Sequence, residues 1–193
     1  EMRPGDWSSD VCSSDLKRQR KRKNDQEDQS MAIKNVSLVY DEKVNINRKA
    51  IEHRATWMGL TYQEGVKEGV DAEGIARKAI RATGHFHGEG FKAACEDPSD
   101  LRQFEHAFLD DLGKSTFQMD VTECTKDDLK IEFHYCPLLA AWKKQGIDDE
   151  TCAKLCDMAM DGDRGIAESM GLTLDLTDTI AKGCPVCKLH FHK

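Results

Sequence analysis

The sequence predicts an α+β fold, with a helical N-terminal half followed by a small antiparallel β-sheet of about four strands packed against helices. Apolar residues recur at helical spacing between residues 45 and 112. From residue 115 onwards they alternate with polar residues in four short segments, which is the pattern of half-buried strands. Helical segments separate the first two strands from the last two, and this order is typical of a sheet with helices on one face.

Three helices are expected in the N-terminal half. The first spans about residues 45–68, and the second follows Asp71, an N-cap residue. Apolar positions of the second helix continue as far as Phe86, where we expect helix to become loop. A third helix starts at Pro98 and ends at Gly113. Its apolar stripe has the i, i+3, i+7, i+11 spacing of a buried face and consists of Leu101, Phe104, Phe108 and Leu112.

Two paired strands are expected next, over residues 115–124 and 129–136, around a turn at 125–128. Alternate residues of a strand face opposite sides of the sheet. In the second strand, Leu129, Ile131, Phe133 and Tyr135 therefore face one way, and Lys130, Glu132, His134 and Cys136 the other. If this alternation holds to the strand end, Cys136 lies on the polar face.

The C-terminal part begins with Pro137, which stops the strand and suits the first turn of a helix that ends near Gly146. Asp148 caps the next helix, and residues 161–163 break the chain before a short helix over 164–170. Two strands, over residues 172–177 and 186–192, complete the sheet. In the last strand Cys187, Leu189 and Phe191 face the core, and Lys188, His190 and His192 face solvent.

Residues 1–30 differ from the rest, and we interpret them as a non-native leader. Residues 6–16 read DWSSDVCSSDL, which looks like a translated sequencing adapter, and a basic run at 17–23 follows. Such a run would suit a nucleic-acid arm, but it lies between the adapter-like segment and MAIKNVS, a natural start for a bacterial protein. We predict one α+β domain over residues 31–193, with the chemistry in a module at 131–193.

Charge and hydropathy exclude several partners. Seven basic and seven acidic residues cancel within residues 1–30, so the net charge of −7 belongs to residues 31–193. An acidic body does not suit nucleic acid, and no run reaches the roughly 18 apolar residues that cross a membrane. We expect a cytoplasmic protein with eight reduced cysteines and a small-molecule substrate. Its apolar helix faces would suit a homodimer.

The cysteines contain one pattern that can bind metal or serve redox chemistry. Cys184 and Cys187 form a CxxC, but it lies in a hairpin turn rather than at the start of a helix. A zinc site needs a second pair of ligands, and Cys152 with Cys156 is the available one. Ordinary hydrophobic cysteines explain these residues better.

The histidines also allow a metal site. His85 and His87 form an HxH, whose rings share a side only in a strand, and His53 could join them. We interpret His190 and His192 as a solvated face. On balance we expect no metal and no cofactor.

Three places can carry chemistry. Cys136 precedes a helix N-terminus, where the helix dipole can favour thiolate, although a buried structural cysteine explains it as well. Asp163 and Arg164 stand in a glycine-flanked turn that can receive a carboxylate, or that forms a helix cap with a local salt bridge. Glu132 and His134 form either an acid–base pair or a plain exposed strand edge.

Three segments carry a family resemblance. They are FHYCPLLAAWKKQG at 133–146, LCDMAMDGDRGIAESMG at 155–171 and DTIAKGCPVCKLHFHK at 178–193. Together and in this order they closely resemble the L-2-amino-thiazoline-4-carboxylate hydrolase family. The strong match covers about a third of the chain.

The resemblance implies hydrolytic opening of a cyclic isothiourea, a type of amidine, to a carbamoyl-cysteine on the route to L-cysteine. Such chemistry needs an anchor for the substrate carboxylate, a base and a proton donor. The candidates are Arg164 and Lys182 as anchors, Asp163 or His134 as base, Cys136 as nucleophile or proton donor, and Cys156 and Cys187 as site-lining thiols.

A second resemblance is more distant. The closing strand, with Gly183 four residues before Cys187, is similar to vinyl-reductase-like sensor domains, which bind small molecules and hold zinc through cysteines and a glutamate. Thr179 stands where those domains have a cysteine, which weakens the zinc expectation. This resemblance implies the alternative function, a small-molecule-binding module without turnover.

Overall fold

The computed structural model describes residues 33–193, so the expectations for residues 1–30 lie outside the described residues. An extended segment at 33–40 leads into the helical half. Its helices are α2 (Glu42–Lys67), α3 (Ala72–Ala94), α4 (Leu101–Phe108) and α5 (Asp111–Phe117). Each begins after an aspartate whose carboxylate accepts a backbone N–H of the first turn. The four caps are Asp41, Asp71, Asp100 and Asp110.

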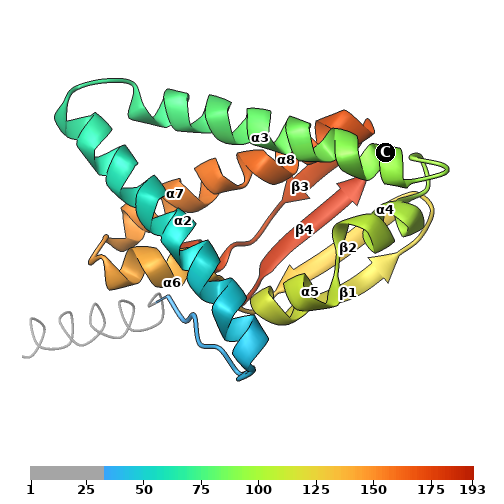
Figure 1. Cartoon of the computed structure of the whole chain (residues 1–193), viewed down its shortest axis with the longest axis horizontal. Helices are drawn as coiled ribbons and strands as arrows, with labels where there is room; N and C mark the ends of the chain where they lie inside the picture. The colour runs from blue at the N-terminus through green and yellow to red at the C-terminus, as the bar shows by residue number, and fades with distance from the viewer. Residues whose placement is uncertain (1–32) are drawn as a thin grey trace, which may run out of the picture. The chain divides into compact units, whose positions relative to one another are not determined.

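The sheet has four antiparallel strands in the order β1-β2-β4-β3 (Figure 1). The strands are β1 (Met119–Cys124), β2 (Asp128–Phe133), β3 (Thr173–Leu176) and β4 (Cys187–His192). Between β2 and β3 the chain forms α6 (Pro137–Lys144), α7 (Asp149–Ala159) and α8 (Asp161–Met170), and the short 3₁₀ helix η1 (Ile180–Lys182) precedes β4. This confirms the predicted α+β class.

The core lies between the helices and one face of the sheet. Leu129 and Ile131 of β2 and Leu189 and Phe191 of β4 are buried, as alternation predicts. Phe104 of α4 packs edge-on against Phe191, with 5.3 Å between ring centroids. The other face of the sheet carries polar side chains.

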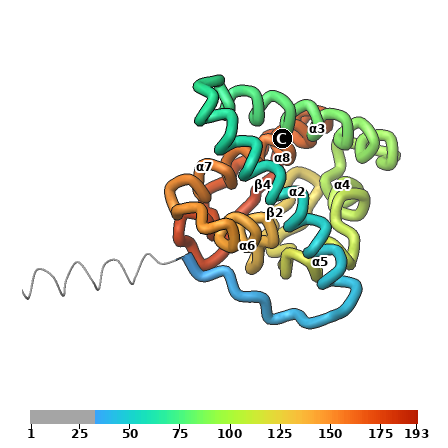
Figure 2. The backbone as a smooth tube through the Cα atoms, turned by 60° about the vertical axis from the view of Figure 1, so that its left-hand side comes forward, coloured from blue at the N-terminus to red at the C-terminus, as the bar shows by residue number. Residues whose placement is uncertain are grey.

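The helices α2 and α3 form the two arms of a V (Figure 1). In both views α2 runs between α6 and α7 on one side and α4 and α5 on the other (Figure 2). Trp142 of α6 is fully buried against α2 and donates its indole N–H to the carbonyl of Ala55, at 2.9 Å. No helix in residues 33–193 is long and apolar enough to span a membrane.

Glycines bring α3 and α8 into backbone contact. A Cβ on Gly84 would lie 2.1 Å from the carbonyl oxygen of Gly162, and one on Gly165 would lie 2.4 Å from that of Arg81. Neither position can carry a side chain without moving a helix. The wall of the molecule formed by α3 and α8 is therefore fixed by close backbone packing.

Some local predictions are wrong. The strands expected over residues 115–124 and 129–136 are shorter, because residues 115–117 belong to α5 and β2 ends at Phe133. The helix expected to run to Gly113 is two helices, because Asp110 starts a new one. The expected loop at His85–His87 is helix to Ala94, because packing on α8 continues past these residues. The expected break at residues 161–163 is the first turn of α8, where Gly162 serves helix packing rather than a turn.

Candidate active site

A cavity of about 320 Å³ lies between the two arms of the V and the helices beneath them. This volume is at the lower end of the range for small-molecule sites, roughly 300–1,000 Å³. Its lining comes from α2, α3, α6, α7 and α8 and is mostly apolar. The lining residues with polar or charged side chains are Arg54, Thr83, His87 and Asp163.

Asp163 is the acidic group of this cavity. Its side chain is largely buried in the first turn of α8, and no other described residue forms a hydrogen bond or ion pair with its carboxylate. Burial raises the pKa of Asp163 to about 6, while its own backbone N–H and the charges of Arg54 and Arg164 oppose the rise. A carboxylate with a pKa near neutrality and no structural partner is suited to general-base chemistry.

Arg54 supplies the positive charge of the cavity. It projects from α2, is exposed, and forms no ion pair with any residue in 33–193. Its guanidinium can bind a carboxylate through two parallel hydrogen bonds. Arg54 and Asp163 thus place an anion-binding group and a base around one cavity.

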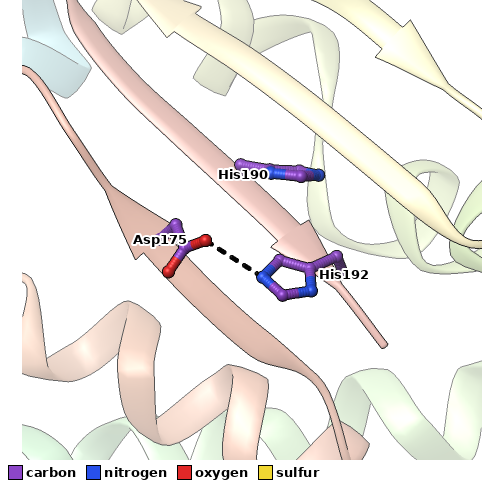
Figure 3. A group of neighbouring side chains, drawn as sticks. All are labelled: Asp175, His190 and His192. Atoms are coloured by element: carbon purple, nitrogen blue, oxygen red, sulfur yellow. Dashed lines mark hydrogen bonds and ion pairs between the residues drawn. The ribbon is translucent and has the colours of Figure 1, made fainter.

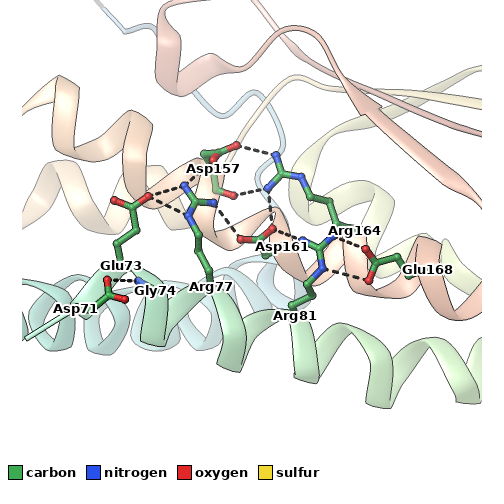
Figure 4. A network of polar contacts seen from close by, with 9 residues as sticks. All are labelled: Asp71, Glu73, Gly74, Arg77, Arg81, Asp157, Asp161, Arg164 and Glu168. Carbon is green, nitrogen blue, oxygen red and sulfur yellow. Dashed lines mark hydrogen bonds and ion pairs between the residues drawn. The ribbon is translucent and has the colours of Figure 1, made fainter.

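Arg164 is engaged elsewhere (Figure 4). Its guanidinium binds Asp157 at 2.7 Å and Asp161 at 3.0 Å. Asp161 is buried and also binds Arg77 at 3.0 Å and Arg81 at 2.8 Å, both on α3. The predicted anchor is therefore one of three arginines in a network that joins α3 to α7 and α8, and its side chain is outside the cavity lining.

Cys136 is the N-cap of α6. Its Sγ accepts the backbone N–H of Leu139 at 3.5 Å, and its backbone pairs with the side chain of Asn35 through two hydrogen bonds of 2.8 Å. Burial raises the pKa of the Cys136 thiol, and the N–H groups of α6 only partly oppose this. The thiol is therefore protonated at neutral pH, and it is outside the cavity lining, although Leu138 is in it.

Cys156 and Cys187 are buried in the core. Burial raises the pKa of both thiols, to about 12 for Cys187, and their proximity to Cys136 adds to the rise. The Cys187 Sγ also accepts the backbone N–H of Ile180 at 3.3 Å. The structure thus brings three predicted site cysteines near one another, of which Cys156 and Cys187 are buried and Cys136 is partly buried.

The remaining predicted residues lie elsewhere. His134 follows β2, is exposed, and pairs with Asp120 of β1 at 3.0 Å. Lys182 is exposed in η1. Neither lines the cavity that holds Asp163.

The HxH of α3 divides between two sides of the helix. His85 binds Glu168 and Ser169 of α8, each at 3.1 Å, whereas His87 lines the cavity. His53 packs on Trp57 on α2, with 5.6 Å between ring centroids. These three histidines do not form a cluster of metal ligands in the described part of the chain.

Sequence reasoning missed Arg54 and His87. Both lie on helices that we interpreted as scaffold, and no motif marks either residue. The available signal was weak: Arg54 directly precedes Ala55, which is fully buried, so its Cα stands at the edge of a buried helix face.

Comparison with known proteins gives one family. A family model described as L-2-amino-thiazoline-4-carboxylic acid hydrolase matches residues 48–191, which are 144 of the 193 residues. No curated protein and no solved structure matches the chain. The matched range contains every residue that lines the cavity. The chain therefore belongs to the L-2-amino-thiazoline-4-carboxylic acid hydrolase family, and this membership implies a hydrolase that opens the cyclic amidine of this substrate on the route to L-cysteine.

Proposed function

We propose that ring opening takes place in the cavity between α2 and α3, with Asp163 as the general base. The observation that carries this proposal is the largely buried carboxylate of Asp163, which has no partner among the described residues and a pKa of about 6, in a small cavity. The thiazoline ring is small enough for such a cavity, and its largely apolar walls suit a compact sulfur heterocycle.

The reaction consumes one water molecule. Asp163 takes a proton from water as the oxygen adds to the amidine carbon, which is bonded to the ring sulfur and two nitrogens. The second water proton moves from the added hydroxyl to the amidine nitrogen, and the tetrahedral intermediate collapses to a C=O group and breaks the bond from this carbon to one ring atom. Protonated Asp163 returns the proton to that leaving atom, so the product is a carbamoyl-cysteine and the carboxylate is regenerated.

Arg54 is the proposed anchor for the substrate carboxylate. It is the cavity arginine without an ion pair in the described chain, whereas the guanidinium of Arg164 already binds two carboxylates. A fixed carboxylate would orient the amidine carbon toward Asp163, and such positioning lowers the barrier of the reaction. Cys136 stays a candidate proton donor, but its place outside the lining makes a capping role the better supported one.

The test is an assay of the purified full-length chain with L-2-amino-thiazoline-4-carboxylate. We expect a product heavier by one water, with a free thiol if the C–S bond breaks or a free amine if a ring C–N bond breaks. The variant Arg54→Gln should raise KM with a smaller effect on kcat, because it removes binding shared by substrate and transition state. Binding of the substrate without any product would instead support a sensor module.

We also propose a cytoplasmic homodimer. The seven cysteines of the described chain are all free thiols, which suits a reducing compartment. Large apolar side chains are exposed on α2 and α3, including Trp57, Ile75 and Phe86. Light scattering of the full chain should give the mass of two copies. The mass of a monomer at micromolar concentration would contradict the proposed dimer.

A further inference from the structure

The polar face of the sheet holds a second cluster of titratable side chains, far from any role in the proposed reaction. His190 and His192 alternate on β4 with buried Leu189 and Phe191, so both rings stand on the polar face. Asp175 of β3 is the direct neighbour of His190 across the sheet, and it shares this face. Figure 3 shows the carboxylate of Asp175 directed toward His192.

The three side chains meet closely. The Oδ2 of Asp175 lies 3.1 Å from the Nε2 of His192, and the rings of His190 and His192 are 4.7 Å apart between centroids. One ligand atom from each residue lies within 4.8 Å of the other two. In residues 33–193 this is the one such group of three or more His, Cys, Asp or Glu side chains.

A fourth residue orients the cluster from the other side. Asp128 of β2 is the direct neighbour of His192, but its Oδ1 lies 2.8 Å from the Nε2 of His190. A carboxylate that accepts a hydrogen bond from one imidazole nitrogen fixes the ring and makes the other nitrogen a better metal ligand. Two aspartates from flanking strands thus hold two histidines of the central strand.

Two imidazoles and one carboxylate are a donor set for zinc and similar divalent transition metals. Zinc bonds of about 2.0–2.1 Å place tetrahedral ligand atoms roughly 3.4 Å apart. The Asp175–His192 pair, at 3.1 Å, is close to this spacing. The ligand atoms of all three residues already lie within 4.8 Å of one another, so small side-chain shifts bring them to it. Rigid antiparallel strands supply all three ligands, so binding requires no backbone change.

We propose that Asp175, His190 and His192 bind a divalent transition metal of the zinc class on the polar face of the sheet. The bound ion would join the edge strand β3 to β4 and leave a fourth position to water. This inference departs from the expectation that these histidines are only a solvated face. It is also independent of the cavity proposal, because Asp163 and Arg54 take no part in it.

The test is zinc binding to the full-length chain after treatment with a chelator, measured by calorimetry and by equilibrium dialysis. We expect one zinc ion bound at this cluster. Its affinity should be at least about 100-fold weaker in His192→Gln and in Asp175→Asn, because losing a metal ligand costs more affinity than losing a residue hydrogen-bonded to a ligand. The variant Asp128→Asn should weaken binding about 10- to 100-fold, as loss of an outer partner does.

The matched control is His106→Gln, because His106 is an exposed histidine of α4 outside the cluster. It should bind zinc as the unchanged chain does. Zinc should also raise the Tm of the unchanged chain and of this control but not of His192→Gln, which shows that the ion binds the folded state. Circular dichroism checks that each variant is folded.

Three results would overturn the proposal. The unchanged chain binds no zinc; or His192→Gln binds zinc as tightly as the control; or bound Co²⁺ shows a thiolate charge-transfer band that persists in His192→Gln. The last result would assign the metal to cysteines instead.

Discussion

At the residue scale, burial sets the protonation state of the carboxyl that the proposed mechanism requires. The carboxyl of Asp163 loses hydration in the first turn of α8, and the nearby positive charge of Arg54 offsets only part of that loss. The result is a base that is ionised at neutral pH but still basic enough to accept a proton.

The first prediction concerns the pH dependence of turnover. With Asp163 as base, kcat/KM should rise with pH through about 6 and then level off. Asp163→Asn should lower kcat by about 10²- to 10⁴-fold, the usual contribution of a general base. Initial rates measured across pH check both effects. A profile without a step near pH 6, or an Asn variant with full activity, contradicts the assignment.

The second prediction is that Asp163 lowers the stability of the folded chain at neutral pH. The pKa of Asp163 is raised from 3.8 to about 6 in the folded chain, so the folded state binds more protons than the unfolded state between these values. Its contribution to the free energy of unfolding therefore falls as pH rises from about 4 to 6. At pH 7, Asp163→Asn should increase that free energy by up to about 3 kcal/mol. Urea unfolding at pH 7 measures this, and the gain should shrink toward pH 4.

The third prediction separates a chemical from a structural role of Cys136. A serine N-cap accepts the same backbone N–H. The free energy of unfolding of Cys136→Ser should therefore lie within about 1 kcal/mol of that of the unchanged chain. Turnover should also persist, because the thiol is protonated and outside the cavity lining. Steady-state kinetics of the folded variant check this. A folded but inactive Ser variant would establish Cys136 as nucleophile or proton donor.

At the element scale, the contact between α3 and α8 determines where Asp163 and His87 stand. The two helices approach so closely that carbonyl oxygens of one meet Cα atoms of the other at Gly84 and Gly165. Side chains on both helices line the cavity, so a shift of either helix would change the distance between its functional groups.

The fourth prediction tests this contact with two substitutions in one helix. Gly84→Ala places a methyl group against the backbone of Gly162 and should lower the free energy of unfolding by about 1–3 kcal/mol. Gly90→Ala is the control, because nothing lies within 4 Å of the added carbon and alanine favours helix. Gly90→Ala should raise the free energy of unfolding by about 0.5–1 kcal/mol. Equal effects of the two variants in thermal unfolding would contradict the close packing.

At the scale of the whole molecule, a network of ion pairs joins the helical half to the C-terminal part. Arg77 and Arg81 extend from α3 to Asp157 and Asp161, and Arg81 also binds Glu168 (Figure 4). Asp161 is central, because its side chain is only 5% exposed and contacts three arginines.

The fifth prediction is that Asp161→Asn lowers the free energy of unfolding by about 2 kcal/mol, since it weakens several charged hydrogen bonds at a buried position. The control is Glu64→Gln, which breaks an exposed pair with Lys67 on α2 and should change stability by less than about 1 kcal/mol. Urea titrations of both variants measure the difference. An Asp161→Asn variant as stable as the control would mean that the network contributes little.

Much of the fold was predictable because it is encoded locally. Aspartate caps and apolar spacing mark the helices, and alternation places Cys187 in the core and His190 on the polar face. The cavity was less predictable, because it arises where distant helices meet. Asp163 stood out through its glycine-flanked position, whereas nothing local distinguishes Arg54 from a surface arginine or shows that Arg164 already binds two aspartates.

The backbone contact of Gly84 with Gly162 also bears on substrate choice. Both glycines line the cavity, so the separation of its α3 and α8 walls is set by two main chains in contact. Trimming or enlarging a lining side chain cannot widen that separation. Acceptance of a larger heterocycle would therefore depend on the side chains of the facing α2 and α6 walls, such as Met58 and Leu138, because the α3–α8 wall is held by main chain.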